Sequence, residues 1–268
     1  GLVGSEMCIR DSTLTKEPEA NYSKEIVFGE FHNKTKNYFS GPKSELPEES
    51  GGWCDYMVEL EFFKSMPEGI RKDAWFLTKV TMTGQERSPE TGRYPLLNWD
   101  DPATNQKHPY WKKNIESSDW VFNYDDGYYE TKGISSASGK TRMIFRYADI
   151  LLLYAEAVAY GTKSIDDLAF DCMWRVQERA GVPLISKDVT KEYFQKAVLD
   201  ERRWETAGME HSCMGRFFTM QRHEILHLQK NYRDAAELSL NPNLTLSEEF
   251  YYFPIPDNEL LIVPGLKD

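Results

Sequence analysis

The sequence predicts an all-α fold in which paired helices carry a loop-rich, aromatic-rich segment packed on them. Two observations lead to this prediction. Apolar residues recur at helical spacing from Thr141 onward, and the stretch before it is punctuated by Pro and holds five of the seven Trp residues. Hydrophobic residues make up 40% of the chain and charged residues 28%, so the chain has the composition of a folded globule.

The first predicted helix follows Thr141. Its apolar positions include Tyr147, Leu151 and Val158, which fall on one face of a helix, and Gly161 ends the run. The spacing therefore predicts a helix that stops at Gly161.

A second helix is predicted between Ser164 and Gly181. Ser164 with Asp167 three residues later is typical of a capping box, and Gly181 followed by Pro183 is typical of a helix end. The two helices form a hairpin about as long as one tetratricopeptide unit, which needs neighbours to bury its apolar face.

Thr190 is expected to open a third helix, and a fourth is expected to start near Gly215. Glu201 and Glu205 lie one turn apart in the third helix, a spacing that also fits a catalytic or metal-binding pair. Two Arg residues lie between them, so we interpret the pair as helix ion pairing.

The chain divides into four predicted segments. Residues 1–12, GLVGSEMCIRDS, resemble a translated sequencing-adapter read, and we interpret them as a non-native artefact behind which a front part of the protein is missing. Residues 13–52 read as a polar loop region, residues 53–140 as an irregular aromatic-rich segment, and residues 141–268 as a helical region. Within the aromatic-rich segment, the alternation of side chains over residues 74–83 predicts a strand.

Charge and composition exclude several partners and sites. The net charge of −11 would repel a phosphate backbone, so no nucleic-acid partner is expected. The longest apolar run, residues 150–154, is too short to span a bilayer. None of the four Cys forms a C-x-x-C pair, which favours free or buried thiols over a metal site or a disulfide framework.

Four motifs in the helical region carry a family resemblance. IFRYADILLLYAEA at residues 144–157 resembles the signature helix of SusD/RagB proteins, VQERAGV at 176–182 their V-R-x-R-A-G-L helix end, and DERRWETA at 200–207 their E-R-R-x-E-x-A helix. FPIP at 253–256 with the later PGL resembles their terminus. The four occur in the family's order, so the chain resembles the C-terminal portion of such a protein.

The resemblance implies a superhelix of tetratricopeptide-like αα pairs and a role without catalysis or cofactor. It implies a surface-exposed lipoprotein of the cell outer membrane, which binds an oligosaccharide and delivers it to a SusC-like TonB-dependent transporter. The membrane would be reached only through an N-terminal lipid anchor that this chain lacks. The family does not name the glycan, and peptide capture stays open.

The aromatic segment is where we expect ligand contact. Flat aromatic rings stack on the apolar faces of sugars, and neighbouring Asp, Asn or Arg side chains bond the hydroxyl groups. The glycan-binding candidates are the aromatic residues with such neighbours: Tyr94, Trp99, Tyr110, Trp111 and Trp120.

Two alternatives belong to other classes. His223-Glu224-Ile-Leu-His227 fits H-E-x-x-H, which on a helix places two imidazoles on one face with a Glu as general base, as in zinc metallopeptidases. No further His follows His227, so the extended three-His form is absent. The other alternative is an interaction scaffold built on helical repeats.

Overall fold

The structure is a computed structural model of the 268-residue chain. It describes residues 25–32, 39–40, 43–112, 120–123, 126–131, 137–139, 141–208, 212–226, 228, 233–240, 255–263 and 265. The chain forms two compact units, Gly1–Gly215 and Arg216–Asp268, and each is described by itself.

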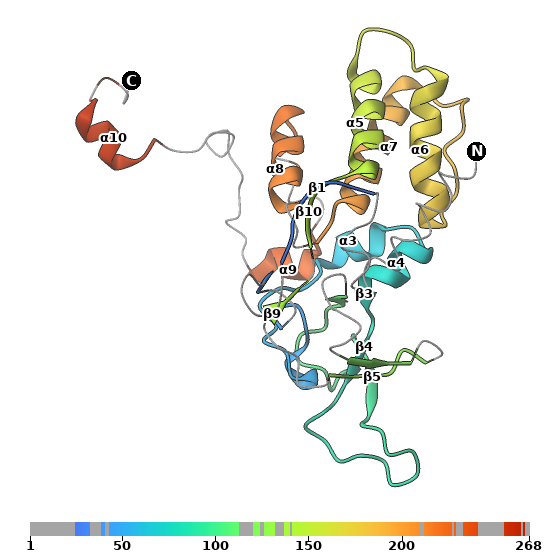
Figure 1. Cartoon of the computed structure of the whole chain (residues 1–268), viewed down its shortest axis with the longest axis vertical. Helices are drawn as coiled ribbons and strands as arrows, with labels where there is room; N and C mark the ends of the chain where they lie inside the picture. Colours follow the sequence, from blue (N-terminus) through green and yellow to red (C-terminus); the bar gives the residue numbers. More distant parts are fainter. Residues whose placement is uncertain are drawn as a thin grey trace. The chain divides into compact units, whose positions relative to one another are not determined.

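The main core of the first unit lies among α5 (Tyr147–Tyr160), α6 (Asp167–Ala180) and α7 (Lys191–Glu205), which Figure 1 shows side by side. Helix α5 packs against both α6 and α7. Several of the buried positions are Ala, which lets the helix backbones approach closely. The core includes Leu152, Ala155, Ala159, Ala169, Met173, Val176, Phe194 and Val198.

The ends of the helices are fixed by short polar contacts and one glycine. The side chain of Asp166 caps α6 by accepting from the backbone N–H of Ala169 at 2.8 Å, so the predicted cap at Ser164 is wrong by two residues. Gly181 ends α6 with a φ of 69°, as predicted, a left-handed conformation that suits glycine. Thr190 caps α7 as predicted.

The segment that opens the predicted first helix is a strand. Strand β10 (Arg142–Arg146) pairs antiparallel with β1 (Ile26–Glu30), and α5 begins only at Tyr147. Met143 is buried and Phe145 is exposed, although they are two residues apart, because the register with β1 shifts between their partners Gly29 and Phe28. Residues 141–146 therefore do not belong to the helix that the sequence predicted.

The prediction of an all-α fold is wrong in a second respect, because the aromatic-rich region pairs into small sheets. Short runs of aromatic and β-branched residues between turns favour such ribbons. The predicted strand over 74–83 is confirmed at 76–77 and 79–81. The further two-stranded antiparallel sheets join β2 (Phe39–Ser40) to β9 (Ala137–Ser138), β3 (Phe76–Leu77) to β6 (Tyr110–Trp111), β4 (Lys79–Thr81) to β5 (Leu96–Asn98), and β7 (Trp120–Phe122) to β8 (Tyr129–Thr131).

Two hydrophobic clusters hold this region together around η2 (Glu48–Ser50), α3 (Leu60–Ser65) and α4 (Ile70–Trp75). In the aromatic cluster, the rings of Phe76 and Trp111 lie with their centroids 5.1 Å apart. Trp204 from α7 packs against the same cluster, so the aromatic region and the helices share a core. The aromatic cluster contains Val58, Met66, Ala74, Trp75, Phe76 and Trp111, and the second cluster Leu46, Leu77, Val80, Met82, Tyr110 and Tyr129.

Two glycines let α4 start directly on the end of α6. A Cβ atom at Gly69 would lie 2.5 Å from the backbone oxygen of Ala180, and one at Gly181 would lie 3.1 Å from Cγ1 of Ile70. A side chain at Gly69 would therefore force the two backbones apart.

A buried ion network centred on Glu205 of α7 joins the elements. Arg71 from α4 contacts both Glu201 at 2.6 Å and Glu205 at 2.9 Å. Arg146 from β10 contacts Glu205 at 3.1 Å, and Arg179 from α6 pairs with Glu205 as well. All five side chains are at most 5% exposed.

The prediction of helix ion pairing at Glu201 and Glu205 therefore has the wrong partners, because both carboxylates face inward to Arg residues of other elements. Burial would raise the pKa of Glu205, but Arg179, Arg146 and Arg71 outweigh it and hold that pKa well below its ordinary value. Burial raises the pKa of Glu201, against the opposing effect of Arg71.

Three helices are described at or beyond the boundary of the second unit: α8 (Ser212–Arg222), α9 (Ala235–Leu240) and α10 (Asp257–Ile262). Helix α8 begins three residues before the predicted start near Gly215. Among the described residues of the chain, we found no helix with the length and apolar character needed to cross a membrane.

Replacing Glu205 by Gln should strongly destabilise the fold. The substitution keeps the shape of the side chain but leaves three buried guanidinium groups without their shared carboxylate, which should cost about 3–5 kcal/mol of unfolding free energy. Urea unfolding at pH 7 measures the change. Glu178→Gln on the exposed face of α6 is the matched control and should shift stability by less than about 0.5 kcal/mol. Equal stability of the two variants would contradict the role given to Glu205.

The same carboxylate predicts a pH dependence. Because the pKa of Glu205 is lowered in the folded state, its contribution is complete above its ordinary value of 4.5 and is lost as the pH falls below that value. The stability margin of the wild-type chain over Glu205→Gln should shrink by about 1.4 kcal/mol per pH unit below about pH 4. Urea unfolding of both proteins from pH 7 to pH 3 checks this, and a margin independent of pH would rule it out.

Trp111→Ala should destabilise the aromatic cluster. The ring is buried against Phe76, so its removal leaves a cavity and should cost about 3–5 kcal/mol. Trp53→Ala, at a ring that is 49% exposed, serves as the control and should cost much less. Thermal unfolding of both variants gives the comparison, and similar melting temperatures would show that Trp111 does not support the core.

Candidate functional site

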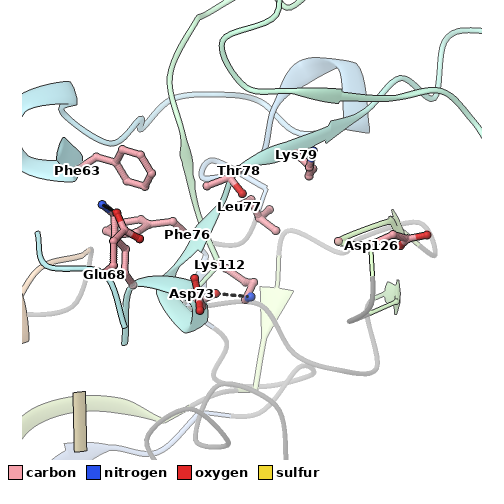
Figure 2. Close-up of a pocket in the computed structure, with 11 residues that line it drawn as sticks. Phe63, Glu68, Asp73, Phe76, Leu77, Thr78, Lys79, Lys112 and Asp126 are labelled. Carbon is pink, nitrogen blue, oxygen red and sulfur yellow. Dashed lines mark hydrogen bonds and ion pairs between the residues drawn. The ribbon is translucent and has the colours of Figure 1, made fainter. Parts of the chain in front are cut away.

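A pocket of about 390 Å³ lies in the aromatic-rich region of the first unit. Pockets of this size accommodate small molecules. Helices α3 and α4, strands β3 and β4, and the segments next to β6 and β8 contribute to its wall, and Figure 2 shows their side chains. The lining residues are Phe63, Glu68, Lys72, Asp73, Phe76, Leu77, Thr78, Lys79, Lys112, Asp126 and Gly127.

One side of the pocket is aromatic. The ring of Phe63 meets Phe76 edge-on with centroids 5.3 Å apart, and it meets Trp99 edge-on at 5.9 Å. Figure 2 shows Phe63 and Phe76 together on this side. Because Phe76 is also part of the aromatic cluster, the core of the region holds this wall in place.

The rest of the lining is polar. Lys112 donates from Nζ to the backbone oxygen of Asp73 at 2.8 Å, the contact drawn in Figure 2. Lys72 donates to the carboxylate of Glu68 at 2.6 Å, and its Nζ lies 4.4 Å from the centre of the Phe63 ring. The pocket thus combines an apolar face with several hydrogen-bonding groups.

Contacts of Arg87 and Arg93 fix the loop between β4 and β5 beside the pocket. Arg87 makes two hydrogen bonds to the carboxylate of Glu130, at 2.8 and 2.9 Å, and its guanidinium lies 3.9 Å from the centre of the Tyr94 ring. Arg93 contacts Asp126 of the pocket at 2.5 Å.

The contacts of Arg87 and Arg93 keep the carboxyl groups of Glu130 and Asp126 charged. The hydrogen bond from Arg87 lowers the pKa of Glu130. The backbone N–H of Tyr128, together with Arg93, lowers the pKa of Asp126. Asp126 is therefore a carboxylate at the pocket edge.

The five predicted glycan-binding residues have different surroundings in the structure. Trp99 lies half-buried against the pocket wall, and Tyr94 lies half-buried under Arg87. Tyr110 is fully buried and Trp111 is 9% exposed, each within a hydrophobic cluster, so these two predictions fail because the rings fill the core. The side chain of Trp120 lies outside the described residues.

Most of the pocket could not be predicted from the sequence. Phe63, Lys79, Lys112 and Asp126 come from four separate segments, and no spacing in the sequence links them. The Pro-rich punctuation pointed to the right region but not to the side chains that meet there.

The helix required for the zinc alternative is not present at His223. Helix α8 ends at Arg222, and Glu224 has a φ of 55°, which turns the chain out of the helix. The helical spacing that would bring His223 and His227 together is therefore broken. The side chain of His227 lies outside the described residues, and among the described ones no three His, Cys, Asp or Glu side chains are grouped to hold a metal ion.

Cys54 and Cys172 are free thiols, as predicted for them. Burial, with a further effect from the Glu48 carboxylate, raises the pKa of Cys54 to about 11, and burial also raises the pKa of Cys172. Both are therefore protonated thiols at neutral pH, which are poor nucleophiles.

Several solved structures share the fold. A SusD superfamily protein from Parabacteroides distasonis matches 95% of this chain and 51% of its own, with a TM-score of 0.66 and 18% identity. A SusD superfamily protein from Bacteroides vulgatus matches 95% of this chain and 53% of its own, with a TM-score of 0.64 and 19% identity. Surface glycan-binding protein A from Bacteroides thetaiotaomicron, in complex with laminarihexaose, matches 95% of this chain and 53% of its own. Its TM-score is 0.57 and its identity is 16%.

These likenesses establish a mostly helical SusD-like fold with small two-stranded sheets, and the chain spans about half the length of the structures it matches. No curated protein matches the sequence. The model of the SusD family matches residues 24–268, and this match accords with the expectation that the chain is not an enzyme. The chain, as its four motifs predicted, belongs to the SusD family.

Proposed function

We propose that this chain is part of a cell-surface protein that binds glycans for nutrient uptake, and that the pocket beside Phe63 is a site of contact. The observation that carries the proposal is the pairing of an aromatic wall with a polar lining in one pocket of about 390 Å³. Sugars need both, because their C–H faces are apolar and their hydroxyl groups form hydrogen bonds.

The placement of Trp99 and Tyr94 supports a binding face that extends beyond the pocket. Trp99 packs edge-on against Phe63, and Tyr94 lies under Arg87. The partner of Arg87 is Glu130 in β8, the strand that follows Asp126 and Gly127. An extended face suits a chain of sugar units better than a single one. The two rings therefore stay candidates for glycan contact.

The relatives support the class of ligand. Two of the structures that share the fold are surface glycan-binding proteins, one from Bacteroides uniformis and one from Bacteroides thetaiotaomicron with bound laminarihexaose. On this basis we favour an oligosaccharide over a peptide as the ligand.

Binding without catalysis suits the acids of the pocket. A glycosidase needs a carboxylic acid with a raised pKa to protonate the leaving group. Asp126, one of the carboxylates that line the pocket, instead has a lowered pKa.

The wider role follows from the family and extends the proposal. We infer delivery of the bound glycan to a SusC-like TonB-dependent transporter, from a lipoprotein anchored at its N-terminus in the outer membrane. The tetratricopeptide-like superhelix belongs to the same proposal, with the α5–α6 hairpin as one of its pairs.

Phe63→Leu should weaken glycan binding. The substitution keeps most of the apolar volume but removes the flat ring, which should weaken binding by about 1–2 kcal/mol, or roughly 5- to 30-fold. Isothermal titration calorimetry of the chain against a panel of oligosaccharides measures the change. Trp99→Ala in the same titrations tests the extension of the face beyond the pocket.

Tyr193→Leu is the matched control, since its ring on α7 is 59% exposed and away from the pocket lining. It should leave both the affinity and the melting temperature unchanged. Clear glycan binding that Phe63→Leu does not affect would remove the pocket from the proposal, and silence across the panel would remove the glycan function.

A further inference from the structure

Two ion pairs neutralise part of the charge that lines the pocket. Lys72 is paired with Glu68 at 2.6 Å, and Asp126 is paired with Arg93 at 2.5 Å. Each pair joins a cation to a carboxylate within direct contact distance, so neither pair gives the pocket a net charge.

Like Lys112, which donates to the backbone oxygen of Asp73, Lys79 has a neutral partner. Its Nζ donates to the side-chain amide oxygen of Asn98 at 2.5 Å. An ammonium group has three donors, and an amide oxygen satisfies one of them without compensating the charge. A positive charge therefore lines the pocket in a chain whose net charge is −11.

The pairing of β4 with β5 makes this arrangement specific. Lys79 lies directly opposite Asn98 in the antiparallel register. Opposite charges at such positions attract across the strands, so an Asp at position 98 would neutralise the lysine at no cost in shape. The amide keeps the cross-strand contact and leaves the charge for another partner.

Gly127 restrains the same lysine. It adopts a φ of 74°, and a Cβ atom there would lie 3.3 Å from Cγ of Lys79. The turn thus lies against the aliphatic part of Lys79, while Asn98 holds the tip. A side chain that is ordered before the ligand arrives loses less conformational entropy on binding.

We propose that Lys79 makes the pocket selective for acidic glycans, with the anionic group of a sugar unit accepting a hydrogen bond from its Nζ. This inference rests on the proposed glycan function. Uronate carboxylates and sulfate esters share the required chemistry. Asp73 also lines the pocket, but Figure 2 shows it beside Lys112 and apart from Lys79.

The test compares each acidic glycan with its own uncharged form. The chain is titrated calorimetrically with galacturonate oligomers and their methyl esters, and with sulfated galactan oligomers and their desulfated forms. A charge-assisted hydrogen bond should make at least one charged form bind roughly tenfold more tightly than its uncharged form. Raising the salt concentration should reduce this preference and leave the uncharged forms unaffected.

Two variants assign the preference to Lys79. Lys79→Gln removes the cation, and Asn98→Asp compensates it while keeping the cross-strand contact. In both variants the charged and uncharged forms of each glycan should bind with equal affinity. Lys196→Gln, at an exposed lysine of α7, changes the net charge as Lys79→Gln does and should keep the preference.

The failures are distinguishable. Equal binding of charged and uncharged forms, or a preference that survives in both pocket variants, overturns the selectivity while glycan binding itself stands. No binding of any oligosaccharide overturns both the selectivity and the function on which it rests.

Discussion

The carboxylate of Glu205 is the contact on which the first unit depends. It lies fully buried and gathers guanidinium groups from α4, β10 and α6, three elements that are far apart in the sequence. Buried charges are tolerated only with partners in good geometry, and here the partners are supplied by different parts of the fold. The network can therefore be complete only when helices, strand and aromatic region are all in place.

This constraint reaches the pocket through α4. Arg71 points from this short helix into the network, while Lys72 and Asp73, the next two residues, line the pocket. A helix of six residues has little stability of its own. Its position, and with it one side of the pocket, is set by the ion pairs of Arg71 and by the aromatic cluster that holds Trp75 and Phe76.

The sequence predicted what depends on local pattern. Gly181 and Thr190 mark helix ends through contacts within a few residues, and both were found where expected. The family motifs were equally local. The strand β10 was missed because its partner β1 lies over a hundred residues away, and hydrophobic spacing alone cannot show such a pairing.

The site was harder to predict for the same reason. An aromatic residue with polar neighbours in sequence can serve a core or a ligand, and only the fold separates Trp111 in the core from Trp99 beside the pocket wall. Glu201 and Glu205 show the same limit, since helical spacing offered nearby Arg partners while burial selected distant ones. Long-range packing decided each of these cases.

The contact between Gly69 and the end of α6 bears on how fast a ligand could come and go. With no room for a side chain between them, the backbones of α4 and α6 meet directly, and α4 cannot rotate as a lid without breaking that contact. A pocket wall held in this way is formed before the ligand arrives, so binding needs no large closure step. Association is then limited by encounter and orientation, and release by the strength of the contacts alone.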